Sequence, residues 1–225
     1  MNILRTVHFP PPISSLLHTL SEVGFFDRSS LIGSWAMPLY QELYGIRYSL
    51  RTLDVDFAVH LAHPQKQMRA DLERLITNLG FIDFVAAEGV QKFTAGGYEV
   101  EFIAHRPGGR EIGALAIREW NIKAIPLPFI RILIDFTETA VLENVLVRFP
   151  TPDAFFVHKV IVAPQRLTVE KREKDLEQCT ALIPTLNDER LRQVLKSQRL
   201  GRETRRRISQ SCAAINFPLQ RLGLE

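Results

Sequence analysis

The sequence LIGSW at 31–35, followed by RTLDVDF at 51–57, decides the fold. In the second segment, apolar residues alternate with Asp54 and Asp56, which is the period-two pattern of a strand with one apolar face. Both aspartates then project from the opposite face, with Cα atoms about 6–7 Å apart. In the first segment a short apolar run ends in Gly-Ser, and apolar residues recur beyond it at helical spacing. We therefore predict a strand, a glycine turn and a helix.

Two carboxylates on one strand face favour binding of a cation. Ligation by oxygen alone suits Mg²⁺ (or Mn²⁺), which keeps several waters and is usually shared with substrate phosphates. The turn at Gly33 and Ser34 offers a phosphate its backbone N–H groups and the positive end of a helix dipole. Together these segments predict a site for a divalent metal and a nucleoside triphosphate (NTP). Taken singly, each has a simpler interpretation, namely a solvated strand face and an ordinary helix cap.

In order, spacing and predicted elements, the two segments resemble the signature of the nucleotidyltransferase superfamily with a DNA-polymerase-beta-like core. In that family an apolar pair and Gly-Ser precede a helix, and Asp-x-Asp lies on the next strand. The resemblance implies an α/β (α+β) fold, with a mixed-sheet nucleotidyltransferase core and a C-terminal helical region. It also implies a third carboxylate on a later strand. The sequence YEVEFI at 98–103 offers Glu101, with Glu99 on the same face as the reserve.

The resemblance further implies a mechanism. Asp54, Asp56 and Glu101 would bind two metal ions, one activating an acceptor hydroxyl and one stabilising the leaving pyrophosphate. Gly33 and Ser34 would position the β- and γ-phosphates. Asp54, Asp56 and Glu101 are accordingly both the expected catalytic residues and the expected metal ligands.

A weaker resemblance extends into PTPDAFFVHK at 150–159 and on to the residues Arg166, Lys171, Lys174 and Asp175. It is similar to bacterial nucleotidyltransferases in which a lysine-bearing helix follows the core, and it implies that Lys159 faces the triphosphate. A salt-bridged lysine is the alternative. The likeness spans about residues 28–185. One departure is the connection 35–53, which is longer than in compact members and could reshape or impair the nucleotide pocket.

Outside these motifs, periodicity predicts an opening helix at 13–23 and a helix from about 64 to 79. Short strands are expected at 81–86, 90–94 and 98–104, followed by a loop at 106–113, while 117–150 is ambiguous, with short β-like runs such as 145–149. After residue 150 the pattern becomes helical, with helices expected at 152–163, 168–183, 187–197 and 200–214. We therefore expect an α/β core with an N-terminal helix at 1–150 and a helical region at 151–225.

Composition excludes several other classes. A hydrophobic content of 46% and a charged content of 24% are typical of a folded soluble protein. The longest apolar stretch, 124–136, is interrupted by prolines and charges, and is shorter than the ~20 residues of a membrane span. The N-terminus lacks the features of a secretory signal, so a cytoplasmic location is expected, with no membrane partner.

Other chemistries lack the residues that they need. Cys179 and Cys212 are far apart, which argues against a disulfide framework and a thiolate zinc site and favours two reduced, structural thiols. The six histidines show no metal-ligand pair at helical spacing. Neither a serine nucleophile elbow nor a Walker-type glycine loop is present.

The net charge of +3 is small but unevenly distributed. The segment from Lys196 to Arg207 carries six basic residues against the single acid Glu203. This segment is suited to bind RNA or DNA by neutralising phosphates, although it has no interleaved aromatic residues for base stacking. A solvated helix face is the alternative interpretation.

The sequence therefore predicts a metal-dependent nucleotidyltransferase that moves a nucleoside monophosphate from an NTP to an acceptor hydroxyl. It does not identify the acceptor, for which RNA, tRNA and protein are the candidates. The alternative is a catalytically silent nucleotide- or nucleic-acid-binding protein of the same fold, in the manner of a toxin–antitoxin pair. The long 35–53 connection and the basic segment motivate that alternative.

Overall fold

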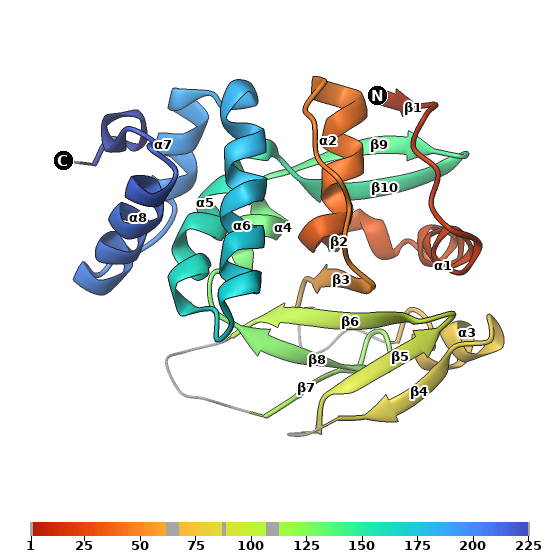
Figure 1. The fold of residues 1–225 in the computed structure, drawn as a ribbon. Helices are drawn as coiled ribbons and strands as arrows, with labels where there is room; N and C mark the ends of the chain where they lie inside the picture. Colours follow the sequence, from red (N-terminus) through yellow and green to blue (C-terminus); the bar gives the residue numbers. More distant parts are fainter. Residues whose placement is uncertain (1, 62–67, 87–88, 107–112, 225) are drawn as a thin grey trace.

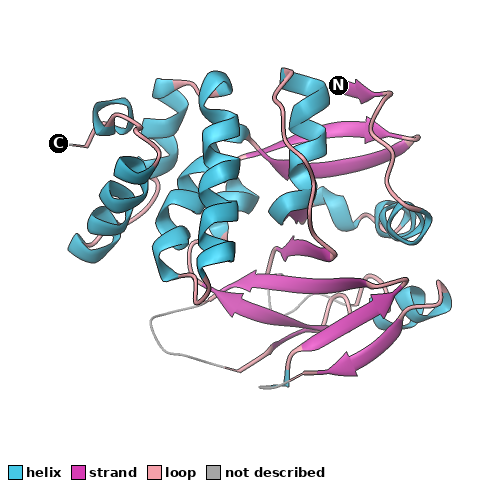
Figure 2. Cartoon of the chain, viewed as in Figure 1, coloured by secondary structure: helices cyan, strands magenta, loops and turns pink. Residues whose placement is uncertain are grey.

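The computed structural model describes residues 2–61, 68–86, 89–106 and 113–224. Its largest element is a mixed sheet of seven strands, most of which are drawn in Figures 1 and 2 below the helices of the C-terminal part. The strands are Ser30–Ile32 (β2), Asp54–Val59 (β3), Ile82–Val85 (β4), Gln91–Ala95 (β5), Tyr98–His105 (β6), Leu115–Ile117 (β7) and Ile122–Leu127 (β8). Strand β3 is parallel to β6, and β6 is parallel to β8, while the other pairs are antiparallel. The expected α/β fold with a mixed sheet is confirmed.

The alternation along β3 and β6 separates an apolar face from a polar one. Val55, Phe57 and Val59 are fully buried, and so are Val100 and Phe102 of the neighbouring strand. The rings of Phe57 and Phe102 stack with centroids 5.7 Å apart. Burial of this face fixes the register, because a slip of one residue would exchange the two faces. The acidic residues are therefore held on the opposite face.

A second sheet has three strands in the order β1-β9-β10, and the sequence did not predict it. Its strands are Asn2–Leu4 (β1), Thr137–Leu142 (β9) and Val145–Pro150 (β10). The pairing of β1 with β9 is parallel and joins the first residues of the chain to residues 140–142. A large part of the unassigned region 117–150 thus forms strands in two different sheets.

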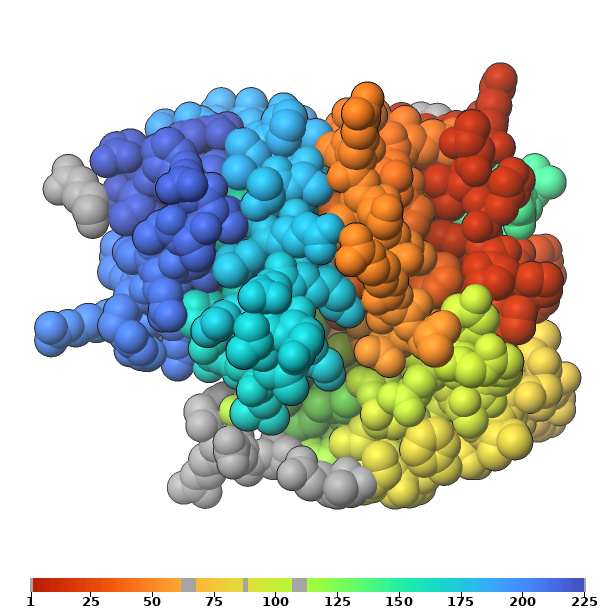
Figure 3. Space-filling model, in the orientation of Figure 1, coloured from red at the N-terminus to blue at the C-terminus, as the bar shows by residue number. Residues whose placement is uncertain are grey.

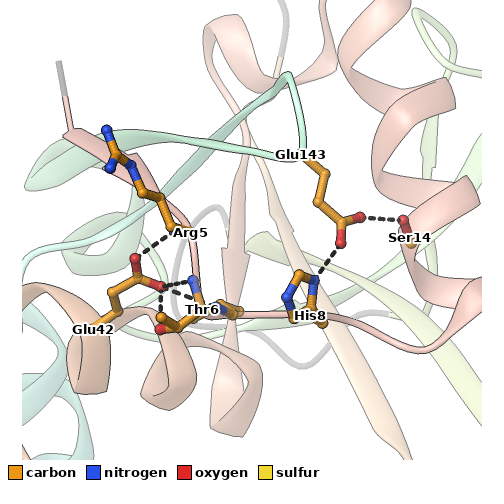
Figure 4. A network of polar contacts seen from close by, with 7 residues as sticks. Arg5, Thr6, His8, Ser14, Glu42 and Glu143 are labelled. Carbon is orange, nitrogen blue, oxygen red and sulfur yellow. Dashed lines mark hydrogen bonds and ion pairs between the residues drawn. The ribbon is translucent and has the colours of Figure 1, made fainter.

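The segment that follows β1 is fastened by two glutamates, shown in Figure 4. The carboxylate of Glu42 accepts hydrogen bonds from the backbone N–H groups of residues 5–7 and from the hydroxyl of Thr6. Glu143 binds His8 at 2.7 Å and the hydroxyl of Ser14 at 3.0 Å. These contacts attach the N-terminal segment to the helix that carries Glu42 and to the β9–β10 hairpin.

The helices of the first part of the chain are Pro11–Glu22 (α1), Met37–Tyr44 (α2), Leu72–Asn78 (α3) and Arg131–Asp135 (α4). The opening helix is close to its prediction. The helix expected from 64 to 79 was predicted too long, since residues 68–71 are not helical and 64–67 lie outside the described residues. The helix begins at Leu72 because the side chain of Asp71 caps it, accepting a hydrogen bond from the N–H of Arg74 at 3.1 Å.

All four helices expected after residue 150 are present. They are Pro152–Val162 (α5), Val169–Leu182 (α6), Asp188–Lys196 (α7) and Arg202–Ala214 (α8). Residues 152–161 of α5 are all buried, so this helix is enclosed on every side and forms the centre of the helical region. Figure 1 shows α6, α7 and α8 grouped around it. The division near residue 150, between an α/β core and a helical region, stays a proposal.

Short 3₁₀ helices complete the described chain. They lie at Phe25–Asp27 (η1), Gly33–Ala36 (η2), Ala163–Gln165 (η4), Ile183–Thr185 (η5) and Leu219–Leu222 (η6). Among the helices of the described ranges, none combines the length and the apolar character that crossing a bilayer requires.

Candidate active site

A cleft of about 390 Å³ lies between the polar face of the seven-stranded sheet and helices α5 and α6. In Figure 3 the surface is hollowed where the teal and cyan helices stand above the green strand layer. Every residue that the sequence proposed for the site lines this cleft, including the reserve: Gly33, Ser34, Asp54, Asp56, Glu99, Glu101 and Lys159. Residues far apart in the sequence therefore meet in one place.

The acidic floor of the cleft is set by the pairing of β3 with β6. Asp54 lies opposite Glu99, and Asp56 lies opposite Glu101. Burial, followed by the negative charge of Glu101, raises the pKa of Asp56 to about 6, although the cations Lys159 and Arg166 oppose the shift. Nearby acids that raise one another's pKa are stabilised by a cation placed among them.

Gly33 makes the closest approach to this floor. Its φ angle is +66°, and a Cβ atom built on it would lie 2.4 Å from Oδ2 of Asp56. Only glycine accommodates both this backbone conformation and this contact. The turn therefore brings the backbone directly against the Asp56 carboxylate, at the point where η2 begins.

Ser34 is held by a residue that sequence reasoning missed. The side-chain amide of Gln178, on α6, donates hydrogen bonds to the hydroxyl oxygens of Ser34 at 2.8 Å and of Tyr48 at 3.1 Å. Ser34 and Gln178 are 5% and 0% exposed. Gln178 is a polar residue on an otherwise buried helix face, and this could have marked it as a functional residue. Its partner Ser34 could not be identified in the same way, because it is 144 positions away.

Lys159 lies in the cleft as part of an ion network. Its ammonium pairs with Asp175, which also accepts a hydrogen bond from Nε of Arg166 at 2.6 Å. Despite burial, the charges of Lys159 and Arg166 hold the pKa of Asp175 below its usual value. Lys159 is thus salt-bridged and also lines the cleft, and its role towards a triphosphate stays a prediction.

Two more lysines of α6, Lys171 and Lys174, complete a cationic wall. Burial and the neighbouring charge of Lys159 lower the pKa of Lys174, while Asp54, Asp175 and Asp56 oppose that shift. The helical side of the cleft is thus positively charged, and it faces the acidic floor.

Glu101 is not free in this structure. It forms an ion pair with Lys92, on the adjacent strand β5, and Lys92 also contacts Glu99 at 2.6 Å. In the parts of the chain that the structure describes, no group of three or more histidine, cysteine or acidic side chains is arranged to hold a metal ion. The carboxylates of Asp54 and Asp56 still offer the oxygen ligands that magnesium prefers.

Beyond the acids, the same cleft becomes apolar. It is lined there by Ile103, Ile125, Leu127, Ile130 and Leu133. Alternation explains the change, because Ile103 follows Glu101 on the same face and lies opposite Ile125 of β8. The cleft can therefore hold a ligand with both an anionic and an apolar part.

The basic segment 196–207 lies elsewhere, since none of its residues lines this cleft. Within it, Arg206 and Arg207 both pair with Glu203. Cys179 and Cys212 are buried and free, which agrees with the structural role that the sequence suggested.

Comparison with known proteins gives a family and distant similarities to solved structures. No curated protein sequence matches the chain. An antigenic nucleotidyltransferase-like protein from Paracoccidioides brasiliensis is 15% identical with a TM-score of 0.45, covering 93% of this chain and 97% of that chain. The antibiotic-resistance factor ANT(2'')-Ia is 16% identical with a TM-score of 0.45, covering 83% of this chain and 88% of that chain. Neither similarity is strong enough to bear on activity.

The family profile is the stronger finding. A profile described as nucleotidyltransferase matches residues 12–200, a range that includes every residue proposed for the cleft. Since the match covers most of the chain, this protein belongs to a family of nucleotidyltransferases, as its sequence motifs predicted.

Proposed function

We propose that this protein is a divalent-metal-dependent nucleotidyltransferase that moves a nucleoside monophosphate from an NTP to an acceptor hydroxyl. One observation carries the proposal, namely that an acidic floor, a glycine-serine turn and a cationic wall all line one cleft. The floor suits metal ions, while the turn and the wall suit phosphates.

Asp54 and Asp56 would hold Mg²⁺ or Mn²⁺, with Glu101 as the third carboxylate. These residues fit a divalent ion because their side chains offer carboxylate oxygens. Burial and adjacent acids raise the pKa of Asp56, and a bound cation would relieve this destabilisation of its ionised form. A bound divalent ion would neutralise phosphate charge and make the acceptor hydroxyl more acidic.

The phosphates would be bound by this chain's own donors. The Ser34 oxygen accepts a hydrogen bond from Gln178, so its own proton is available to a phosphate oxygen. The turn at Gly33 adds backbone N–H groups at the start of η2. Lys171 and Lys174 would stabilise the negative charge of the leaving pyrophosphate.

In the reaction, the acceptor oxygen forms a bond to the α-phosphorus as the bond from that phosphorus to the bridging oxygen breaks. Pyrophosphate leaves, and the hydroxyl proton passes to solvent or base. The acceptor we propose is RNA, tRNA or protein. Exposed Arg199, Arg202 and Arg205 of the basic segment favour a nucleic acid.

Labelled NTPs test the proposal. Purified protein is incubated with each of the four α-labelled NTPs and Mg²⁺ or Mn²⁺, alone, with total RNA and with a protein extract. The expected result is metal-dependent pyrophosphate release with transfer of label to one acceptor class. The Asp56→Asn protein should transfer no label, and activity that survived this change would show that the metal site is wrongly assigned.

One observation favours the alternative of a catalytically silent binding protein, namely the ion pair between Glu101 and Lys92. Under that alternative, NTP binds with metal but no label is transferred to any acceptor. Calorimetry with an NTP and Mg²⁺, run beside the transfer assay, separates the two functions. If the protein neither bound an NTP with metal nor transferred label, both proposed functions would be wrong and only the family membership would remain.

A further inference from the structure

Lys92 occupies an unusual place at the edge of the acidic floor. Its register partner across the β5–β6 pair is Glu101, which is itself the register partner of Asp56 across the β6–β3 pair. The ammonium contacts Glu99 at 2.6 Å and forms an ion pair with Glu101. Two carboxylates of the cleft thus converge on one lysine from a third strand.

This contact differs from an ordinary surface salt bridge. The side chains of Lys92 and Glu101 are only 22% and 17% exposed, and both line the cleft that contains Asp54 and Asp56. A short strand connection holds the lysine in place, because β5 and β6 form a hairpin in which Ala95 pairs with Tyr98. The ammonium is therefore a fixed part of the site.

A divalent ion bound at Glu101 would compete directly with this ammonium. To make room, Lys92 would have to give up its ion pairs with both carboxylates. At Asp54 a metal ion would meet no such competition. Among the described residues, Asp54 forms no salt bridge. The two ends of the acidic floor therefore differ in what a metal must displace.

We propose that Lys92 takes the place of one of the two divalent ions, so that the cleft binds a single divalent ion at Asp54 and Asp56. This inference rests on the proposed metal-dependent function and sets its metal stoichiometry. Lys92 keeps Glu101 in position and supplies a fixed positive charge beside the metal. It is a positioning residue, since it acts through Glu101.

The test counts bound ions directly, without an activity assay. Mn²⁺ is titrated into the purified full-length chain, and free Mn²⁺ is followed by its electron paramagnetic resonance signal. Wild-type protein should bind one equivalent tightly. Lys92→Met should gain a second equivalent, bound at least tenfold more tightly than any second ion in the wild type. Lys92→Gln provides a second variant, and thermal unfolding checks that both are folded.

Lys123→Met is the matched control, because it removes an exposed lysine on β8 that does not line the cleft. It should leave one equivalent bound. Two tight equivalents in the wild type would overturn the inference and leave the proposed function standing. Absence of Mn²⁺ binding in the wild type and in both Lys92 variants would instead count against the proposed function itself.

Discussion

The side-chain amide of Gln178 donates a hydrogen bond to the hydroxyl oxygen of Ser34, and so joins helix α6 to the turn at the floor of the cleft. We expect Ser34→Ala to weaken binding of an NTP with Mg²⁺ by roughly 10- to 100-fold, since a hydrogen bond to a charged group contributes about 1.5–3 kcal/mol. Calorimetry with a non-hydrolysable NTP measures the change.

Gln178→Leu should weaken the same binding through the same hydroxyl, because Ser34 loses the donor that orients it. The losses from Ser34→Ala and Gln178→Leu should therefore be less than additive in the double variant. Additive losses would show that Gln178 acts independently of Ser34. Thermal unfolding of each variant separates loss of binding from loss of fold.

Gly33→Ala should damage the site more than it damages the fold. The new Cβ lies 2.4 Å from Oδ2 of Asp56, and the carboxylate can avoid it only by turning away. The matched control is Gly45→Ala, at φ +69° with no atom within 4 Å of its Cβ, which carries a similar backbone penalty of roughly 1–2 kcal/mol. Urea unfolding and Mn²⁺ affinity measure both variants.

Both variants should lose a similar free energy of unfolding. Only Gly33→Ala should also lose affinity for Mn²⁺, by tenfold or more, which corresponds to about 1.4 kcal/mol or more of binding free energy. Equal metal affinity in the two variants would mean that the approach of Gly33 to Asp56 has no role in binding.

Asp56→Asn should stabilise the metal-free protein near neutral pH. The pKa of Asp56 is about 6 in the fold against 3.8 for the ordinary group, so the folded state binds more protons between these values. Stability therefore falls as the pH rises through this window, and the cost is fully present above about pH 6. Two pKa units correspond to roughly 3 kcal/mol. Urea unfolding should show the gain near neutral pH and none below the ordinary pKa.

The same pKa predicts the pH dependence of metal binding. Since the ligand is the ionised carboxylate, the dissociation constant of Mn²⁺ should be flat above about pH 6 and rise by about tenfold per pH unit below it. Asp56→Asn should remove this dependence along with most of the affinity. If the Mn²⁺ dissociation constant of the wild type stayed constant down to about pH 4, the pKa of Asp56 would not be raised and the prediction would be wrong.

Glu42→Gln should loosen the N-terminal segment. Burial raises the pKa of Glu42, but hydrogen bonds from Arg5, Thr6 and Val7 outweigh it and lower the pKa to about 2. The stabilisation is therefore present above the ordinary value of 4.5 and is lost as the pH falls towards 2. The variant should melt at a lower temperature near neutral pH, and the difference should shrink in acid.

Glu143→Gln offers a comparison, because Glu143 fastens the same segment through His8 and Ser14. Hydrogen exchange of the β1 amides compares the two variants. If Glu42→Gln left the protection of these amides unchanged, Glu42 would not be the residue that holds the segment in place.

The sequence predicted the parts of the site that depend on local pattern. Alternation placed Asp54 and Asp56 on one face, and the same rule placed Glu101 with Glu99. That these two strands lie side by side came from the resemblance to the nucleotidyltransferase superfamily, and the register of β3 with β6 agrees with it. The Gly33 turn was equally local. The family match and the sheet topology confirm the predicted family and fold class.

What the sequence did not predict depends on contacts between distant segments. The position of Lys92 beside Glu101 needs the register of the β5–β6 hairpin, and the Gln178 contact needs the packing of α6 against the turn. The parallel pairing of β1 with β9 is similarly non-local. The helix expected from 64 was too long because apolar spacing outweighed the capping signal of Asp71.

The arrangement of the cleft has a consequence for synthesis of the chain. Its floor comes from residues before 102, but Lys171 and Lys174 of the cationic wall, and the Gln178 amide that contacts Ser34, come from α6. A nascent chain that has not yet released α6 from the ribosome has the carboxylates but lacks these two lysines and the Gln178 amide. Under the proposed function, a chain interrupted before α6 would have an incomplete cleft and would not act on NTPs.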